Sequence, residues 1–250
     1  MPIEKGNFIL VDYVTKIKET GEIFDTTIEE EAKKGGIFKG DATYEAMLIV
    51  VGEGWVLKEL DQSLIGLEVG KPTVIEIPPE KGFGLRDPSK IRLVPIRRFR
   101  GEKVNLYPGA QVEVDGNIAV VRSVGSGRVQ LDFNSPLAGK TLIYDLTVKS
   151  MIEDVKDRII ALTHRRIASV EAAKFEVELM EKEIYIELPE EAFYLDGVQF
   201  AKRGIASDIQ KFFPEIEKIT FKESFIKYAQ PVVEKPQEQE AAPADTESAQ

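Results

Sequence analysis

The sequence predicts an α+β fold built on an antiparallel half-barrel sheet with one short helix. Three observations support this prediction: a strand-rich first half, a hairpin-rich stretch that interrupts it, and a last third in which helical and strand periodicities alternate. Apolar residues that recur at every second position indicate strands, and those that recur at every third or fourth indicate helices. We therefore expect a half-barrel domain, a small β domain inserted into it and a C-terminal α-β-β-α-β domain.

Composition limits the chemistry that this chain can perform. The 250 residues include no Cys and a single His, which excludes disulfides, thiolate metal sites and most zinc or general-base chemistry. The net charge of −10 argues against a general affinity for nucleic acid, because phosphate binding needs clustered cations. The chain has no apolar run of about 18 residues, and no signal-peptide core follows Met1. We expect a cytoplasmic protein that does not bind membranes.

The first strands surround a tight turn. Residues Phe8 to Thr15 alternate apolar and polar side chains, the chain turns at Glu19 to Glu22, and it returns through Phe24 to Asp25. The segment 28–44 is rich in Glu, Lys and Gly and is expected to be a solvated surface loop, with or without a helical turn. The apolar segment 45–51 predicts the next strand.

The stretch from Val51 to Gly84, VGEGWVLKELDQSLIGLEVGKPTVIEIPPEKGFG, organises the first domain. Its Gly-x-Gly turn permits backbone conformations that a side chain would forbid. Leu57, Leu60 and Leu64 form the apolar face of a short helix, and Thr73 to Ile77 reads as a strand closed by two prolines.

This stretch, together with the opening VDYVTKIKETGEIFDTT, resembles the FKBP family of peptidyl-prolyl isomerases. The resemblance implies an apolar pocket for proline and a substrate carbonyl bound by the backbone N–H of Leu57. Leu60 stands where many relatives have Trp and where SlyD-type members commonly carry Leu, and Phe83 departs from the family pattern because Tyr is usual there. The residues that the resemblance assigns to this catalytic pocket are Tyr13, Phe24, Asp25, Met47, Trp55, Val56, Leu57, Leu60, Phe83 and Tyr144.

Each early pocket residue also has a structural interpretation. Tyr13 and Phe24 are equally compatible with ordinary inward-facing positions in a barrel. Asp25 is harder to explain in that way, because a carboxylate in an apolar turn needs a hydrogen-bond partner or a function. The alternative for Asp25 is a turn cap.

The pocket that the resemblance implies would be sufficient for the reaction. Rotation about an X–Pro bond is opposed by a barrier of about 18–20 kcal/mol, which arises from amide resonance. A dry, aromatic-lined site disfavours the polar planar amide relative to the twisted one. No nucleophile, metal or cofactor is required, and we expect none.

An additional segment separates this stretch from the closing strand, Thr141 to Val148. A hairpin signal at Asp115-Gly116 and the alternating segment 129–133 predict three or four strands. Its position resembles the insert-in-flap domain of SlyD-type members, which binds unfolded chains, while a packing accessory is the alternative. The resemblance implies client binding by Leu93, Val94, Ile96, Phe99 and Val112.

Metal binding is not expected, although some SlyD-type relatives bind nickel. Ser135 stands where such members carry a His, and the C-terminal tail has neither His nor Cys. The single His164 lies in a helical pattern and is expected to be a surface residue rather than a ligand or base.

The predicted domains are 1–87 with 137–153 for the half-barrel, 88–136 for the insert, 154–228 for the C-terminal domain and 229–250 for a disordered acidic tail. The C-terminal domain carries no active-site motif, and we expect it to bind partners or to form a homodimer. Both barrel-closing strands precede Glu153, so a chain ending there is expected to fold.

The sequence thus predicts a peptidyl-prolyl cis-trans isomerase that acts in protein folding, with chaperone activity from the insert. Its expected partners are unfolded or proline-containing polypeptides, and macrolide inhibitors would fit the same pocket. The alternative is a non-catalytic chaperone or assembly protein on the same scaffold.

Overall fold

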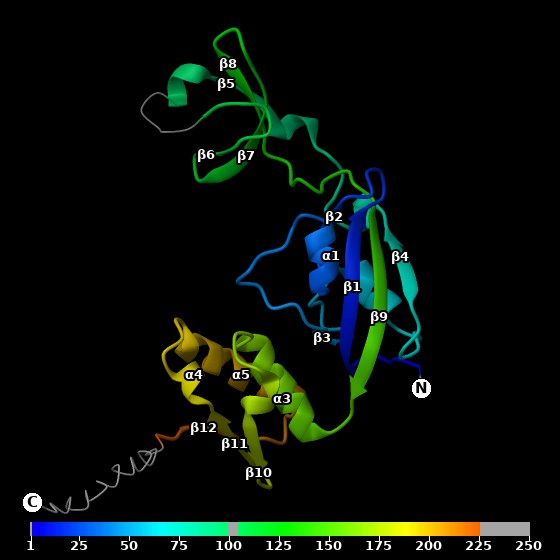
Figure 1. Ribbon diagram of the computed structural model, residues 1–250, viewed down its shortest axis with the longest axis vertical. Helices are drawn as coiled ribbons and strands as arrows, with labels where there is room; N and C mark the ends of the chain where they lie inside the picture. Colours follow the sequence, from blue (N-terminus) through cyan, green and yellow to red (C-terminus); the bar gives the residue numbers. More distant parts are fainter. Residues whose placement is uncertain (1, 100–104, 226–250) are drawn as a thin grey trace, which may run out of the picture.

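The computed structural model describes residues 2–99 and 105–225, which form three β-sheets with accompanying helices (Figure 1). The largest sheet has five antiparallel strands in the order β2-β1-β9-β4, with β3 paired to β1 beside β2. Its strands are β1 (Phe8–Ile17), β2 (Ile23–Thr26), β3 (Met47–Val50), β4 (Thr73–Ile77) and β9 (Leu142–Ile152). The predicted antiparallel sheet is therefore present, and its closing strand extends beyond Val148.

The pair of long strands β1 and β9 forms the centre of this sheet. They pair from Phe8↔Ile152 to Ile17↔Leu142, with a register shift after Leu10. Because side chains alternate across a strand, one set of β1 and β9 residues faces the core between the sheet and α2. This core includes Ile9, Val11, Leu60, Leu64, Ile77, Tyr144 and Leu146.

Two short helices belong to this first domain, where one was predicted. Helix α2 (Lys58–Ser63) is the predicted one, and Gly66 follows it in the left-handed conformation with φ of 85°. Helix α1 (Glu29–Lys34) lies in the segment that was predicted as a surface loop. Ala32 is the only buried residue of α1, so the sequence of this helix shows almost no apolar periodicity. An ion pair between Glu29 and Lys33, one turn apart, stabilises the helix on its exposed side.

The insert is a separate four-stranded antiparallel sheet in the order β5-β8-β7-β6. Its hairpins turn at Asp115-Gly116 and Ser126-Gly127, and all four residues have positive φ, as tight two-residue turns require. A 3₁₀ turn at Ile96–Phe99 follows the first strand. The strands are β5 (Ile91–Pro95), β6 (Gln111–Val114), β7 (Asn117–Gly125) and β8 (Arg128–Asp132).

The C-terminal domain places helices against a three-stranded sheet in the order β10-β11-β12. β11 runs antiparallel to β10 and parallel to β12, so the chain must cross over through α4 and α5 before β12. The predicted α-β-β-α-β order is found, with α4 as an additional short helix. Its elements are α3 (Val155–Arg166), β10 (Glu176–Leu179), β11 (Glu183–Leu188), α4 (Glu190–Phe193), α5 (Val198–Phe212) and β12 (Lys218–Glu223). The predicted disordered tail, 229–250, lies outside the described residues.

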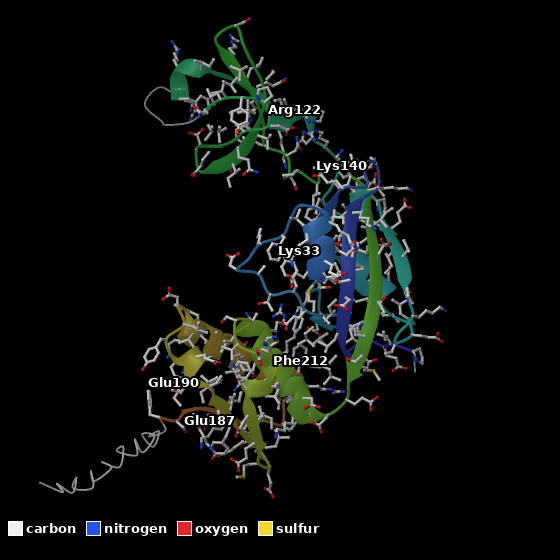
Figure 2. All side chains as sticks on the ribbon, viewed as in Figure 1. Lys33, Arg122, Lys140, Glu187, Glu190 and Phe212 are labelled. Carbon is white, nitrogen blue, oxygen red and sulfur yellow. The ribbon has the colours of Figure 1, made fainter. Side chains whose placement is uncertain are left out.

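The C-terminal domain and the first domain share one hydrophobic core. Phe8, Leu48 and Val50 of the first domain are buried in the same cluster as residues of α3 and α5. The ring centroids of Phe8 and Phe212 lie 5.2 Å apart in an edge-to-face arrangement. Figure 2 shows Phe212 where α5 meets the first domain. The first domain therefore depends on α5 to cover part of its apolar surface.

The insert and the C-terminal domain lie at opposite ends of the β1–β9 pair and project to the same side of it (Figure 1). The loop between α1 and β3 projects into the space between them. In residues 2–99 and 105–225, no helix has the length and apolar character that crossing a membrane requires.

Candidate active site

A cavity of about 200 Å³ opens beside α2 in the first domain. Strands β1, β2, β3 and β9, the loop before α2 and α2 itself contribute side chains to it. The residues from β1, β3 and β9 are spaced two apart, as one face of a strand requires. The cavity is lined by Val11, Tyr13, Asp25, Met47, Ile49, Trp55, Val56, Leu57, Leu60, Leu64, Tyr144 and Leu146. Eight of the ten residues that the sequence assigned to the pocket are in this set, and it is mostly apolar.

The one carboxylate in the cavity wall is bound by a phenol. Tyr13 Oη donates to Asp25 Oδ2 at 2.8 Å, and the rings of Tyr13 and Tyr144 lie 6.1 Å apart. Within the described residues, Asp25 accepts no hydrogen bond from a turn N–H, which argues against the turn-cap interpretation. The bond holds Asp25 at the edge of an otherwise apolar cavity.

Both tyrosines keep their protons over a wide pH range. Burial raises the pKa of Tyr13, and the neighbouring Asp25 charge raises it further. Burial also raises the pKa of Tyr144 to about 12, with a further contribution from Asp25. At neutral pH Tyr13 is therefore a hydrogen-bond donor to Asp25, and neither phenol supplies a charge to the cavity.

Two of the predicted pocket residues lie elsewhere. Phe83 is 43 % exposed and does not line the cavity, because it follows the 3₁₀ turn at Pro79–Lys81 outside the sheet. Phe24 precedes Asp25 on β2; its ring packs against the same core as the cavity residues and lines a larger neighbouring cleft. Neither ring lines the small cavity, and a role of either residue in binding substrate stays a prediction.

The turn that carries Trp55, Val56 and Leu57 is held by a residue that the sequence analysis missed. Asp61, on α2, is only 6 % exposed, and its carboxylate accepts hydrogen bonds from the N–H groups of Gly52 (2.8 Å) and Gly54 (3.0 Å). The sequence did contain a signal for this role, because Asp61 is a charged residue directly after Leu60, on the apolar face of the predicted helix. Asp61 positions one wall of the cavity without lining it.

His164 was predicted to be a surface residue, but its side chain is mostly buried. The first domain packs against this part of α3 and covers it. The His164 side chain is 14 % exposed, its Nδ1 lies 2.8 Å from the carbonyl oxygen of Val170, and its Nε2 contacts the carboxylate of Glu45. His164 thus links the C-terminal domain to the first domain. Among the described residues, no three His, Cys, Asp or Glu side chains cluster as a metal site would require.

The residues predicted to bind client chains divide into two groups. Val94, Phe99 and Val112 are buried in the insert's own core, because its two hairpins pack their inward faces together, so these three assignments are corrected. Ile96 is partly buried against the same core, whereas Leu93 is 60 % exposed. The sequence analysis missed Ile118, which is 69 % exposed on β7. An alternating strand pattern shows that two faces differ, but it does not show which face the rest of the domain covers.

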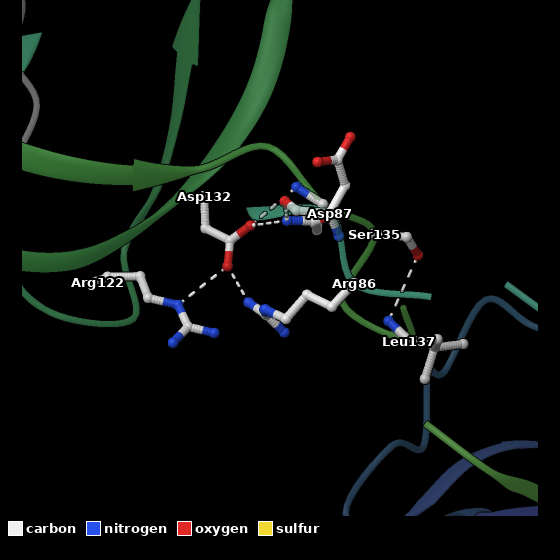
Figure 3. A network of polar contacts seen from close by, with 7 residues as sticks. Arg86, Asp87, Arg122, Asp132, Ser135 and Leu137 are labelled. Carbon is white, nitrogen blue, oxygen red and sulfur yellow. Dashed lines mark hydrogen bonds and ion pairs between the residues drawn. The ribbon is translucent and has the colours of Figure 1, made fainter. Parts of the chain in front are cut away.

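A polar network ties the insert to the first domain (Figure 3). Asp132, 2 % exposed, receives hydrogen bonds from Arg86, from Arg122 (2.9 Å) and from the backbone and side-chain N–H groups of Asn134 (2.9 and 2.8 Å). The Asn134 amide also pairs with the backbone of Asp87, through two bonds of 2.9 Å. The two connecting segments are therefore bound side by side rather than separately mobile.

Comparison with known proteins places these features in one family. The FKBP26 C-terminal family model matches residues 155–226, and the FKBP26 IF-domain model matches residues 92–137. The short-type peptidyl-prolyl cis-trans isomerase of Methanocaldococcus jannaschii is 36 % identical over 149 residues, which cover 60 % of this chain and 94 % of the relative. The FKBP-type 16 kDa peptidyl-prolyl cis-trans isomerase of Escherichia coli is 27 % identical over 150 residues, 58 % of this chain and 91 % of the relative. The SlyD isomerase of Helicobacter pylori is 26 % identical over 145 residues, 55 % of this chain and 77 % of the relative. With an apolar cavity at the predicted place in its first domain, the chain belongs to the FKBP-type peptidyl-prolyl cis-trans isomerases.

Proposed function

We propose that this protein catalyses cis-trans isomerisation of X–Pro bonds in polypeptides that are folding, and that its insert holds those polypeptides near the catalytic pocket. The observation that supports catalysis of isomerisation is the small apolar cavity with the Tyr13–Asp25 pair in its wall. Family membership supplies the reaction class. The role of each residue within the cavity is part of this proposal.

The cavity suits an amide that must lose resonance. A volume of about 200 Å³ accommodates a proline ring and little more, and its apolar walls exclude the water that would stabilise the planar, polar amide. Leu57 precedes α2, and its backbone N–H makes no hydrogen bond within the described part of the chain. That N–H is in a position to fix the substrate carbonyl while the amide twists.

The proposed chaperone activity rests on the free face of the insert. Register places Leu93 and Ile118 on the face of the sheet opposite its core, and both side chains are exposed. Among residues 2–99 and 105–225, β5 and β6 are the outer strands of this sheet, so each offers a backbone edge that pairs with no other described strand to an extended chain. An unfolded polypeptide bound there stays near the pocket, which raises its effective concentration to about the millimolar range.

Two assays on matched variants test whether the cavity catalyses isomerisation and the insert binds the polypeptide. In the first, exchange spectroscopy follows isomerisation of a short Ala-Leu-Pro-Phe peptide; in the second, proline-limited refolding of a whole protein is followed. The double variant Leu93→Ser, Ile118→Ser should retain turnover of the short peptide and lose most of the acceleration of refolding. Glu176→Ser, at an exposed position of β10 in the C-terminal domain, is the control and should change neither rate.

Excision of the insert gives an independent test. Phe133 N–H donates to the Lys90 carbonyl at 3.0 Å, so the ends of the segment are already adjacent and a short loop can join them. The excised protein should turn over the short peptide at a modestly reduced rate and accelerate refolding far less. Equal losses in both assays would make the insert part of the catalytic site.

The alternative is a chaperone or assembly protein that has lost catalysis. Phe83 favours it, since a family position that usually supplies a phenol here carries an exposed ring outside the cavity. Absence of short-peptide turnover in the folded, full-length protein would establish this alternative.

A further inference from the structure

A second and larger cavity lies directly beside the proline pocket. It has a volume of about 980 Å³, and it is enclosed on one side by the first domain and on the other by α3 and the segment that follows it. Tyr13, Asp25 and Met47 line both this cleft and the small cavity. The two spaces therefore meet at the edge where a bound proline would be held.

Contacts between the two domains fix the spacing of the cleft walls. The shared core that joins Phe8 to Phe212 holds the domains together. Two polar contacts also cross from one wall to the other, between His164 and Glu45 and between Thr43 Oγ1 and the Ala168 carbonyl (3.3 Å). The C-terminal domain is thus a fixed wall of this cleft.

The lining of the cleft combines apolar surface with a few charges. Phe24 and Met47 contribute apolar side chains from the first domain, and Ile160 and Ala161 contribute them from α3. Lys39, Glu45, Asp157 and Arg165 also line it, so groups of both signs are present. Such a mixture suits a polypeptide, which carries apolar side chains and backbone hydrogen-bonding groups, better than it suits a purely apolar ligand.

We propose that the cleft is a binding site for the polypeptide segment on one side of the proline, bound in extended form. This inference rests on the proposed isomerase function, because it takes the proline pocket as its starting point. A cavity of about 200 Å³ cannot hold more than the proline and its immediate surroundings, so the rest of the chain must leave across its edge. At the edge formed by Tyr13, Asp25 and Met47 it enters the cleft. The volume of about 980 Å³ lies within the range of about 300–1,000 Å³ typical of ligand sites.

Three proline peptides test the proposal on the full-length protein. One is the short tetrapeptide, one carries five further residues before it, and one carries five further residues after it. Turnover is followed by exchange spectroscopy, and affinity is followed by the fluorescence of Trp55, the single tryptophan of the chain. One of the two extended peptides should bind about tenfold more tightly than the tetrapeptide, because it buries additional apolar side chains.

Substitutions at two neighbouring positions test whether the tighter binding of the extended peptide arises in the cleft. Ala168 lines the cleft, and Ser169, the next residue, is exposed and does not line it. Ala168→Arg should remove the gain in affinity of the extended peptide, and Ser169→Arg, which adds the same charge, should preserve it. Equal loss of affinity for the short and extended peptides in Ala168→Arg would overturn the proposal, since the effect would then arise in the proline pocket.

The remaining outcomes separate this inference from the function on which it rests. If the tetrapeptide is turned over and neither extension improves binding, the cleft proposal fails and the isomerase proposal stands. If no peptide is turned over but one extension still binds more tightly and depends on Ala168, the cleft proposal stands and catalysis fails. A dimer that Ala168→Arg dissociates would assign the cleft to a second copy of the chain and overturn the proposal.

Discussion

The guanidinium carbon of Arg165, on α3, lies 3.8 Å from the centre of the Trp55 ring, which lines the small apolar cavity of the first domain. Phe212 of α5 meets the same indole edge-on, with ring centroids 5.9 Å apart. One wall of the pocket is therefore supported from behind by two residues of the C-terminal domain. A cation over an aromatic face is stabilising, with a contribution of about 0.5–2 kcal/mol according to its exposure.

Substitution of Arg165 should report on this contact through the single tryptophan. Arg165→Gln should change the intensity and emission maximum of Trp55 and lower the free energy of unfolding by about 1 kcal/mol, because the charge over the ring is lost. Arg203→Gln, at an exposed position of α5, is the control and should change neither. An unchanged emission spectrum in Arg165→Gln would show that the two groups do not interact in solution.

Substitution of Asp25 should separate catalysis from stability. Asp25→Ala should lower short-peptide turnover severalfold and leave the thermal midpoint nearly unchanged, since Asp25 is exposed and its bonded partner is the phenol of Tyr13. Tyr13→Phe, which removes the donor and retains the ring, should lower turnover in the same direction. A lowered midpoint with unchanged activity per folded molecule would make Asp25 a structural residue.

Substitution of Asp61 should lower stability as well as turnover. Asp61→Ala leaves the N–H groups of Gly52 and Gly54 without their carboxylate acceptor, which should cost about 1–2 kcal/mol of stability, because the carboxylate is buried while both glycines are exposed. Turnover should fall as well, because the same turn carries Trp55 and Leu57 into the pocket. Urea unfolding measures the first effect and exchange spectroscopy the second. Loss of turnover at full stability would contradict a positioning role.

Removal of the C-terminal domain should destabilise the first domain, contrary to the expectation from sequence. A chain that ends at Glu153 would expose Phe8, Leu48 and Val50, which are buried against α3 and α5. We expect aggregation or a lowered thermal midpoint, because exposed apolar patches favour association. Replacing these three residues by polar ones in the truncated chain should reduce the aggregation. A truncated chain that is monomeric and as stable as the full protein would refute this expectation.

The buried phenol of Tyr144 should reduce stability at alkaline pH. Its pKa is raised from 10.0 to about 12 in the native state, so above pH 10 the unfolded chain releases the proton while the native state retains it. The stabilisation is complete below pH 10 and declines as the pH rises toward 12.

Tyr144→Phe tests this linkage directly. The variant should lose part of the alkaline decline, and the difference from the wild-type free energy of unfolding should change between pH 9 and pH 11. Tyr107→Phe, an exposed tyrosine of the insert, is the control and should follow the wild type. Unfolding curves for Tyr144→Phe that remain parallel to the wild type across this range would contradict the linkage.

Local patterns in the sequence were sufficient to predict most elements of the fold. Strand alternation around Tyr13 and Tyr144, the helix at Leu60 and the hairpin at Asp115-Gly116 are each set by side chains within a few residues, so they could be predicted from sequence alone. Helix α1 could not be predicted as a helix from such a pattern, because its stability depends on surface ion pairs and on burial of Ala32 rather than on an apolar stripe.

The assignments that failed are those that depend on contacts between distant segments. Which of Leu93 and Val94 is exposed is decided by the strands that pack on one face of the insert, and the burial of His164 is decided by Glu45, which lies 119 positions earlier in the chain. The environment of Trp55 is likewise set by Arg165 and Phe212. The sequence determined which segments form strands and helices, because those choices are local, and its resemblance to a family indicated which of them line the small cavity. Only the tertiary structure decided that the C-terminal domain supports that pocket and extends it as a cleft, because burial is a property of the surfaces that meet and not of either segment alone.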